Sequence, residues 1–318
     1  MSAFSAAWLA LREPADHAAR SPALTRKLAD WAKRKARLRI RDLGAGTGSN
    51  LRYLAPRLAV DQEWSLIDHD PLLLARLPEV LAAWAARRGY PAKPVAGGMQ
   101  LQINGVEVGV SWTQAELSAL SRDDFSVDVD LVTASALLDL VSLDWIQALS
   151  RRCRDQDCAA LLALTYDGRI HWTPTLPGDA LVRDLLNRHQ RQDKGLGVAL
   201  GPEGAMAAAS CFAALGLSAA LENSDWQLGT DACDLQAAIA RGWAEAAIEM
   251  DPAANHSIRP WLESRLERLR SGASRLSVGH RDLLVLPSAD VSLKAAGDHG
   301  RLGLALNASD LGKPPSAS

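Results

Sequence analysis

The spacing of apolar residues predicts a chain in which strands and helices alternate. Short apolar runs of strand length occur at 38–43, 64–68, 130–133 and 159–164. Between the first and second of these runs, and again after the second, apolar residues recur at helical spacing. Such alternation is typical of a parallel sheet with helices on both faces, so the fold class expected is α/β.

A separate helical cap is predicted before this core, over residues 1–36. Leu24, Leu28 and Trp31 recur at i, i+4 and i+7, which is one face of an amphipathic helix. Nearer the N-terminus, Pro14 follows an apolar cluster and predicts a break in the first helix.

A β-hairpin is predicted at 99–110. Apolar and polar residues alternate over 99–103 and again over 106–110, and Asn104-Gly105 separates the two runs. Asn-Gly between alternating runs is the strongest short-range hairpin signal. The second run, extended over 106–112, is the expected third strand of the parallel sheet.

The second half of the chain breaks the regular alternation. We expect auxiliary insertions at 168–201 and 231–270, the first of them a loop over the mouth of an active site. Further strands are expected at 217–226 and 276–286, with the main domain covering 37–287. Residues 288–318 are rich in Ser, Gly, Ala and Pro, and we expect a mobile tail there.

The most informative motif is Asp-Leu-Gly-Ala-Gly-Thr-Gly at 42–48, between the first expected strand and the helix after it. Glycines in such a turn let backbone N–H groups approach a ligand closely, and the helix N-terminus favours negative charge. The next strand ends in Asp68, close to the ~20 residues downstream expected of an acid that binds a ribose.

The glycine spacing separates two kinds of nucleotide site. Dinucleotide folds use G-x-G-x-x-G, whereas here Gly48 completes a D-x-G-x-G-x-G pattern and Ser49 follows. This pattern resembles the first motif of class I S-adenosylmethionine-dependent methyltransferases. The run Asp-His-Asp-Pro at 68–71 resembles the second motif of that family. The alternatives are a dinucleotide site and a glycine turn that binds nothing.

The resemblance covers roughly residues 37–170. It implies a Rossmann-like sheet of seven strands, with the last strand antiparallel, and S-adenosylmethionine as cofactor. It places Asp42 and the glycine loop at the methionine end, Asp68 at the ribose, His69 beside the adenine and the fourth strand beneath the sulfonium. The cofactor-binding residues implied are Asp42, Gly44, Ala45, Gly46, Gly48, Asp68, His69, Ala115, Glu116 and Ser135. Among these, Glu116 and the backbone N–H of Ala115 are expected to meet the adenine.

Candidate catalytic residues follow the fourth and fifth strands, at Asp139 and His171. Ligands bind outside the carboxyl ends of the strands in open parallel sheets, which is where both residues are expected. Asp139 or Asp167 is expected to orient a substrate donor group. A histidine titrates near neutrality and suits a general base, and the neighbouring Trp172 suits a planar substrate. The alternatives are a loop acid, a loop histidine and a packing tryptophan.

Metal dependence is not expected. Asp139 and Asp167 end adjacent strands and could share a Mg²⁺ ion, but Gly168 stands where a third oxygen ligand is usual.

The substrate expected is a small molecule. The segment after the fourth strand lacks the Asn-Pro-Pro-Tyr type of motif used on DNA bases, and the chain has no Pro-Cys dipeptide. The net charge of −2 gives no basic field for nucleic acid. An RNA methyltransferase with a basic face, and a binding protein without catalysis, are the alternatives. The basic face would comprise Lys27, Lys33, Arg34, Lys35 and Arg37.

The expected location is the cytoplasm. The four cysteines form no C-x-x-C pair, and no signal peptide or long apolar span is recognised. The sequence leaves the oligomeric state open.

Overall fold

The computed structural model describes residues 5–118 and 128–287. The predicted tail at 288–318 lies outside the described residues. Within the described part, no helix is both long and apolar enough to span a membrane.

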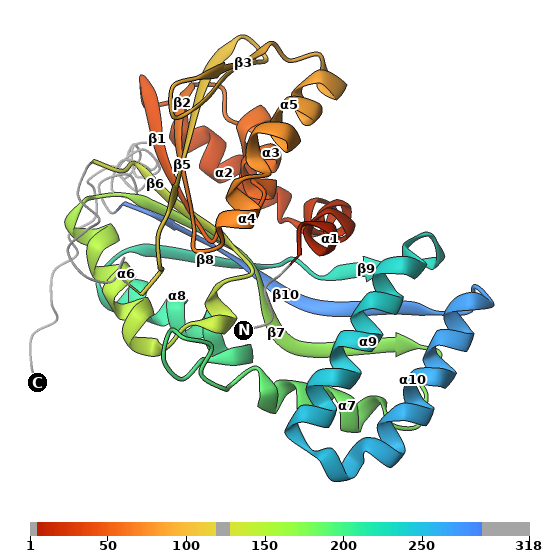
Figure 1. Ribbon diagram of the computed structural model, residues 1–318. Helices are drawn as coiled ribbons and strands as arrows, with labels where there is room; N and C mark the ends of the chain where they lie inside the picture. The colour runs from red at the N-terminus through yellow and green to blue at the C-terminus, as the bar shows by residue number, and fades with distance from the viewer. Residues whose placement is uncertain (1–4, 119–127, 288–318) are drawn as a thin grey trace, which may run out of the picture.

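The centre of the molecule is one mixed sheet (Figure 1). Its seven principal strands lie in the order β5, β2, β1, β6, β7, β10, β8. Their bounds are β1 Arg37–Leu43, β2 Asp61–Asp68, β5 Val106–Gln114, β6 Leu131–Ser135, β7 Ala159–Thr173, β8 Ser218–Asn223 and β10 Arg275–Leu286. The first five strands in this order pair in parallel, and β10 is antiparallel to both of its neighbours. The predicted α/β, Rossmann-like fold class is therefore confirmed.

Three shorter strands extend this sheet within the described residues: β3 Ala92–Val95, β4 Gly98–Ile103 and β9 Trp226–Leu228. The β4–β5 hairpin turns at Asn104 and Gly105, both with positive φ, as the Asn-Gly pair predicted. β3 and β9 were not predicted as separate strands.

Helices cover both faces of the sheet because alternate strand residues point to opposite faces. Leu38 and Ile40 of β1 pack in one core cluster with α2 (Pro22–Ala32), α3 (Ser49–Leu54), α4 (Pro71–Leu74) and α5 (Leu77–Arg88). Val132 and Ala134 of β6 pack in a second cluster with α6 (Leu143–Asp155) and α8 (Gly204–Ala214).

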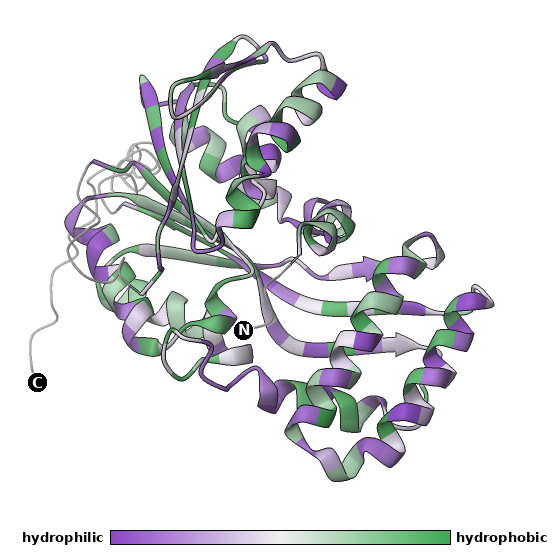
Figure 2. Ribbon diagram, in the orientation of Figure 1, coloured by the Kyte–Doolittle hydropathy of each residue, from purple (hydrophilic) through white to green (hydrophobic). Residues whose placement is uncertain are grey.

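Two strands of this sheet extend into a second lobe. β7 and β10 continue past the parallel core and carry β9, with α7 (Asp179–His189), α9 (Cys233–Met250) and α10 (Asn255–Arg270) packed beside them (Figure 1). Hydrophilic and hydrophobic residues are mixed along α10 (Figure 2), and its buried residues recur at helical spacing, as expected of a helix with one buried face. A third core cluster fills this lobe, built around Trp172, Trp226 and Trp261.

The predicted end of the fifth strand near Leu164 is wrong. β7 passes that point through an irregular register, with Leu164 at φ 53° and its N–H donated to Asp282 Oδ1 at 2.8 Å. His171 and Trp172 are therefore strand residues and do not belong to a loop. Asp282, which accepts this N–H, lies 118 positions away in the sequence. Local sequence therefore does not reveal the bond.

The first helix, α1 (Ala6–Ala19), lies across the site end of the sheet, near β9 (Figure 1). It runs through Pro14, where the sequence predicted a break. Side chains on both sides of Pro14 bond to other elements, as described below, and these contacts hold the helix together across the missing N–H.

Candidate functional site

The glycine loop joins β1 to α3 and depends on glycine at three positions. Gly44, Gly46 and Gly48 have φ values of 66°, 54° and 79°, a region that side chains disfavour. Gly48 is the N-cap of α3. The loop therefore presents its backbone at the carboxyl end of β1.

Asp68, at the end of β2, holds this loop in place. Its Oδ2 accepts the N–H of Gly46 at 2.7 Å and its Oδ1 accepts the N–H of Asp70 at 2.9 Å. The imidazole Nδ1 of His69 lies 3.3 Å from Oδ1, and its side chain is about half exposed. Asp68 is thus a structural part of the loop, and its predicted contact with a ribose stays a prediction.

Asp42 is the buried acid of the loop. Asn50 Nδ2 donates to its Oδ1 at 2.9 Å, while Oδ2 has no hydrogen-bond partner among the described residues. Burial raises the pKa of Asp42 to about 7. A buried carboxylate oxygen without a donor is costly, and it marks a place where a ligand's donor group would be stabilised.

A buried polar chain that the sequence did not predict supports Asp42. Arg20 Nη1 donates to Asn50 Oδ1 at 2.7 Å, and Arg20 Nε lies 3.4 Å from Asp282 Oδ2. Asn50 also donates to Thr133 Oγ1 at 2.8 Å.

A cavity of about 60 Å³ lies between the glycine loop, the end of β6 and α1. Asp42, the loop, Ser135 and Ala136 line one side, and Leu9, Arg12 and Asp16 of α1 line the other. Leu9 Cδ1 lies only 2.9 Å from the place that a Cβ on Gly46 would occupy. Small-molecule sites usually enclose about 300–1,000 Å³, so α1 covers this one closely.

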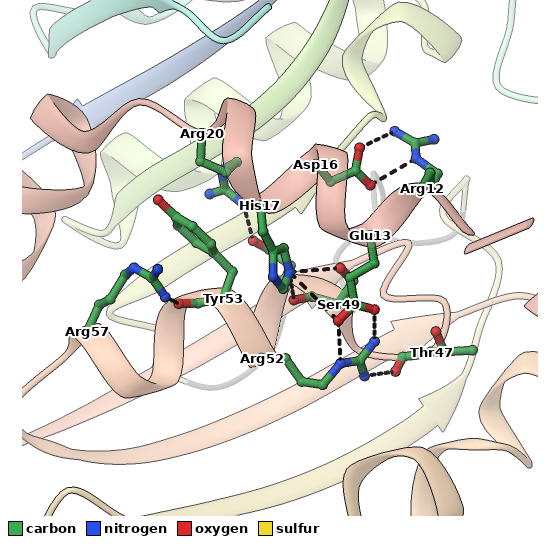
Figure 3. A network of polar contacts seen from close by, with 11 residues as sticks. Arg12, Glu13, Asp16, His17, Arg20, Thr47, Ser49, Arg52, Tyr53 and Arg57 are labelled. Atoms are coloured by element: carbon green, nitrogen blue, oxygen red, sulfur yellow. Dashed lines mark hydrogen bonds and ion pairs between the residues drawn. The ribbon is translucent and has the colours of Figure 1, made fainter. Parts of the chain in front are cut away.

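Polar contacts fasten α1 onto the helix that follows the loop (Figure 3). Glu13 forms a bidentate ion pair with Arg52, and Arg52 also donates to the carbonyl of Thr47. His17 Nε2 lies 3.0 Å from the carbonyl oxygen of Ser49. Burial lowers the pKa of His17, so the ring is neutral at pH 7. We call these contacts between 13–17 and 47–52 the α1 clasp.

The residues predicted for the adenine lie at the ends of β2 and β5. Glu116 is exposed just beyond β5. The Ala115 N–H is already donated to the carbonyl of Asp68 at 3.0 Å. The parallel pairing of β2 with β5 uses this N–H, and the predicted contact of Ala115 with an adenine stays a prediction.

The predicted acceptor-side residues separate in the structure. Asp139 is buried beyond the end of β6, and its Oδ1 has no hydrogen-bond partner among the described residues. Asp167 is held by Arg169 at 2.6 Å and by Arg281 at 3.3 Å. His171 lines a different hollow, of about 420 Å³, together with Arg169 and Arg183. The structure does not bring His171 to the glycine-loop cavity.

No group of three or more His, Cys, Asp or Glu side chains within 5–118 and 128–287 is arranged to hold a metal ion.

No family model and no curated protein matches the chain. Solved structures resemble it at low identity. A SAM-dependent methyltransferase from Geobacter sulfurreducens, in complex with S-adenosyl-L-homocysteine, is 18% identical, with a TM-score of 0.42 over 89% of this chain and 98% of that one. A cyclopropane synthase from Mycobacterium tuberculosis is 13% identical, with a TM-score of 0.43 over 89% and 94%. A putative sarcosine dimethylglycine methyltransferase from Galdieria sulphuraria is 15% identical, with a TM-score of 0.39 over 83% and 84%.

Proposed function

We propose that this protein is a class I S-adenosylmethionine-dependent methyltransferase. The observation that carries the proposal is the unpartnered Oδ2 of buried Asp42, beside a glycine loop at the carboxyl end of β1. An α-ammonium group of a methionine moiety supplies the donor and the positive charge that this oxygen lacks. A dinucleotide has no ammonium group to place there.

The remaining predicted residues fit the same ligand. Asp68 accepts one hydrogen bond at each oxygen, and a carboxylate oxygen has room for a second donor such as a ribose hydroxyl. His69 and Glu116 are exposed at the neighbouring strand ends, where an adenine would lie. Gly44, Ala45 and Gly46 bring the backbone close, and Ser135 lies across the cavity from α1.

The bound cofactor would supply an electrophilic methyl group on a sulfonium. The chain's own part is to hold the acceptor in line and to exclude water, which are the main sources of rate in such a transfer. α1 performs the second task, because Leu9 and the α1 clasp close the cavity against solvent. Asp139 belongs to this proposal as an acceptor-side residue, whereas a role for His171 stays a prediction.

We propose a small-molecule acceptor. The covered cavity suits a compact substrate, and the basic segment predicted as an RNA footprint is largely neutralised. Lys33 pairs with Asp30, Lys35 with Asp130 and Arg37 with Glu63.

The cysteines are free thiols, which suits the cytoplasm. In this proposal residues 1–36 are the cap, and 168–201 and 231–270 are auxiliary to the domain at 37–287.

Calorimetry with S-adenosylhomocysteine and with NAD tests the proposal. The wild-type protein should bind S-adenosylhomocysteine and not NAD, and Asp42→Asn should bind it at least about tenfold more weakly. Asp144→Asn is the matched control, because Asp144 is an exposed acid on α6. Binding of NAD without binding of S-adenosylhomocysteine would overturn the proposal.

Incubation with methyl-labelled cofactor and fractionated cell extract then tests catalysis. Label in the small-molecule fraction is the expected result. Label in RNA would support the alternative enzyme, and cofactor binding without any transfer would support a binding protein.

A further inference from the structure

A buried group of charged and aromatic residues lies beyond the cavity, where α1, the end of β6 and the second lobe meet. We call it the acceptor cluster, and it comprises Arg12, Asp16, Asp139, Tyr166, Trp226 and His280. The rings of His280 and Trp226 are 5.0 Å apart, and those of His280 and Tyr166 are 6.3 Å apart. Trp226 Nε1 donates to Asp16 Oδ1 at 3.0 Å. Arg12 and Asp16 also line the glycine-loop cavity, which joins the acceptor cluster to it.

Two atoms of this cluster can accept a hydrogen bond. The first, Asp139 Oδ1, is buried without a hydrogen-bond partner, and no ion pair reaches this carboxylate among the residues that the structure describes. His280 Nδ1 lies 3.1 Å from the carbonyl of Val278, so Nδ1 carries the proton and Nε2 is left as an acceptor. Burial lowers the pKa of His280 to about 4, which keeps the ring neutral at pH 7. The ligand complementary to these two atoms is a hydrogen-bond donor.

The cluster already holds one cation. The guanidinium of Arg12 lies over the Trp226 ring at 5.1 Å and forms a bidentate pair with Asp16, at 2.8 and 3.1 Å. This pairing engages both carboxylate oxygens of Asp16. Asp139 forms no ion pair among the described residues, and Arg12 acts on its charge only at a distance. An aromatic face that attracts one cation, beside a carboxylate without a cation, favours a second positively charged group.

We propose that the acceptor cluster binds the methyl acceptor and that this acceptor is a small amine. The inference rests on the proposed function and deepens it. The amine binds as an ammonium and first gives one proton to Asp139, so the carboxylate is both the binding partner and the base. The lone pair of the resulting neutral amine then bonds to the methyl carbon as the carbon–sulfur bond breaks with its electron pair on sulfur, which leaves an N-methylammonium and a neutral thioether.

Three probes of one size but different charge test the inference on the wild-type protein. Propylamine, propanol and propionate are titrated in the presence of S-adenosylhomocysteine, with ligand-observed NMR as the measure of weak binding. Propylamine should bind at least about tenfold more tightly than the other two. Equal binding of propanol, preference for propionate or no binding of propylamine would overturn the inference.

Two variants locate the site. Asp139→Asn should remove the preference for propylamine while leaving the affinity for S-adenosylhomocysteine unchanged. Asp144→Asn, a control on an exposed acid nearby in the chain, should change neither. Propylamine binding that survives Asp139→Asn in a protein that still binds S-adenosylhomocysteine would contradict the assignment.

The same titrations separate the two proposals. Failure of S-adenosylhomocysteine to bind contradicts the proposed function, and the amine series on the free protein then tests the acceptor cluster alone. Binding of S-adenosylhomocysteine without any amine preference contradicts only the acceptor cluster.

Discussion

At the scale of single residues, Asp42 shows a conflict between stability and binding. Its carboxyl group is buried with one oxygen unpartnered, and burial raises its pKa from 3.8 to about 7. Ionising it inside the empty protein is unfavourable, whereas an ammonium group would make the ionised form favourable. Such groups are frequent at functional sites.

Asp42→Asn should therefore stabilise the protein without ligand at high pH. The folded wild type binds more protons at Asp42 than the unfolded chain between pH 4 and 7, so its stability falls as pH rises through that window. The amide carries no charge and still accepts the Asn50 hydrogen bond. Denaturation at pH 8 should show a gain on the order of 4 kcal/mol, which disappears near pH 4.

A variant that is no more stable than wild type at pH 8 would show that the ionised Asp42 carboxylate does not destabilise the folded protein. Asp144→Asn serves as the control at each pH.

Asp68→Asn should weaken S-adenosylhomocysteine binding by about tenfold or more, because the amide removes a charged acceptor of N–H and O–H donors. A second effect adds to this one, because Asp68 also accepts the N–H of Gly46 and so holds the glycine loop in place. Calorimetry measures the affinity, and circular dichroism checks that the variant is folded. An unchanged affinity in a folded variant would show that another residue binds the ribose.

At the scale of elements, α1 controls access to the cavity. It covers the glycine loop through Leu9 and is fastened by the α1 clasp. The cavity of about 60 Å³ is smaller than most small-molecule sites, so we expect α1 to move outward when the cofactor enters. Entry and release are then limited by this helix.

Glu13→Gln should speed both steps, because it removes the charge from the pair with Arg52. A partly buried ion pair of about 1 kcal/mol corresponds to about a fivefold change in rate. Stopped-flow tryptophan fluorescence with S-adenosylhomocysteine measures both rates. Glu79→Gln is the control, since Glu79 forms an exposed pair with Arg76 on α5. Unchanged rates in Glu13→Gln would mean that α1 does not gate the cavity.

The elements nearest the glycine loop were predictable from sequence because their signals are local. The strand ending at Leu43, the turn at 44–48 and the hairpin at Asn104 follow from neighbouring residues alone. The extension of β7 was not predictable, because Asp282 bonds to Leu164 from the far end of the chain.

The same limit applies to the site. Asp42 and Asp68 stand in a recognisable motif, whereas Arg20 and His280 reach the site through tertiary contacts without any motif. His171 was misplaced because a strand residue was predicted to be a loop residue.

At the scale of the whole molecule, the second lobe and the parallel sheet share β7 and β10. Neither strand is interrupted between the two parts, so one backbone belongs to both cores. We expect the two parts to unfold together.

Trp172→Ala should destabilise the whole protein by about 3–5 kcal/mol, since it empties a buried site in the lobe core. Trp172 packs against Trp243 and lies under the Arg265 guanidinium at 4.3 Å. Unfolding followed by circular dichroism and by tryptophan fluorescence should show a single transition with the same midpoint. Trp172→Phe should lose less free energy of unfolding than Trp172→Ala. Two separate transitions would show that the lobe unfolds independently.

The contact between Arg20 and Asp282 has a consequence for how the protein is made. The two residues lie near opposite ends of the chain, and Asp282 accepts the backbone N–H of Ser21 as well. During synthesis, the glycine loop and α1 leave the ribosome long before their anchor on β10 exists. A chain interrupted before residue 282 has every residue of the glycine motif but lacks the acid that seats Arg20, Asn50 and hence Asp42. The binding site is thus completed only when β10 is in place, and we expect chains that end before it not to hold the cofactor.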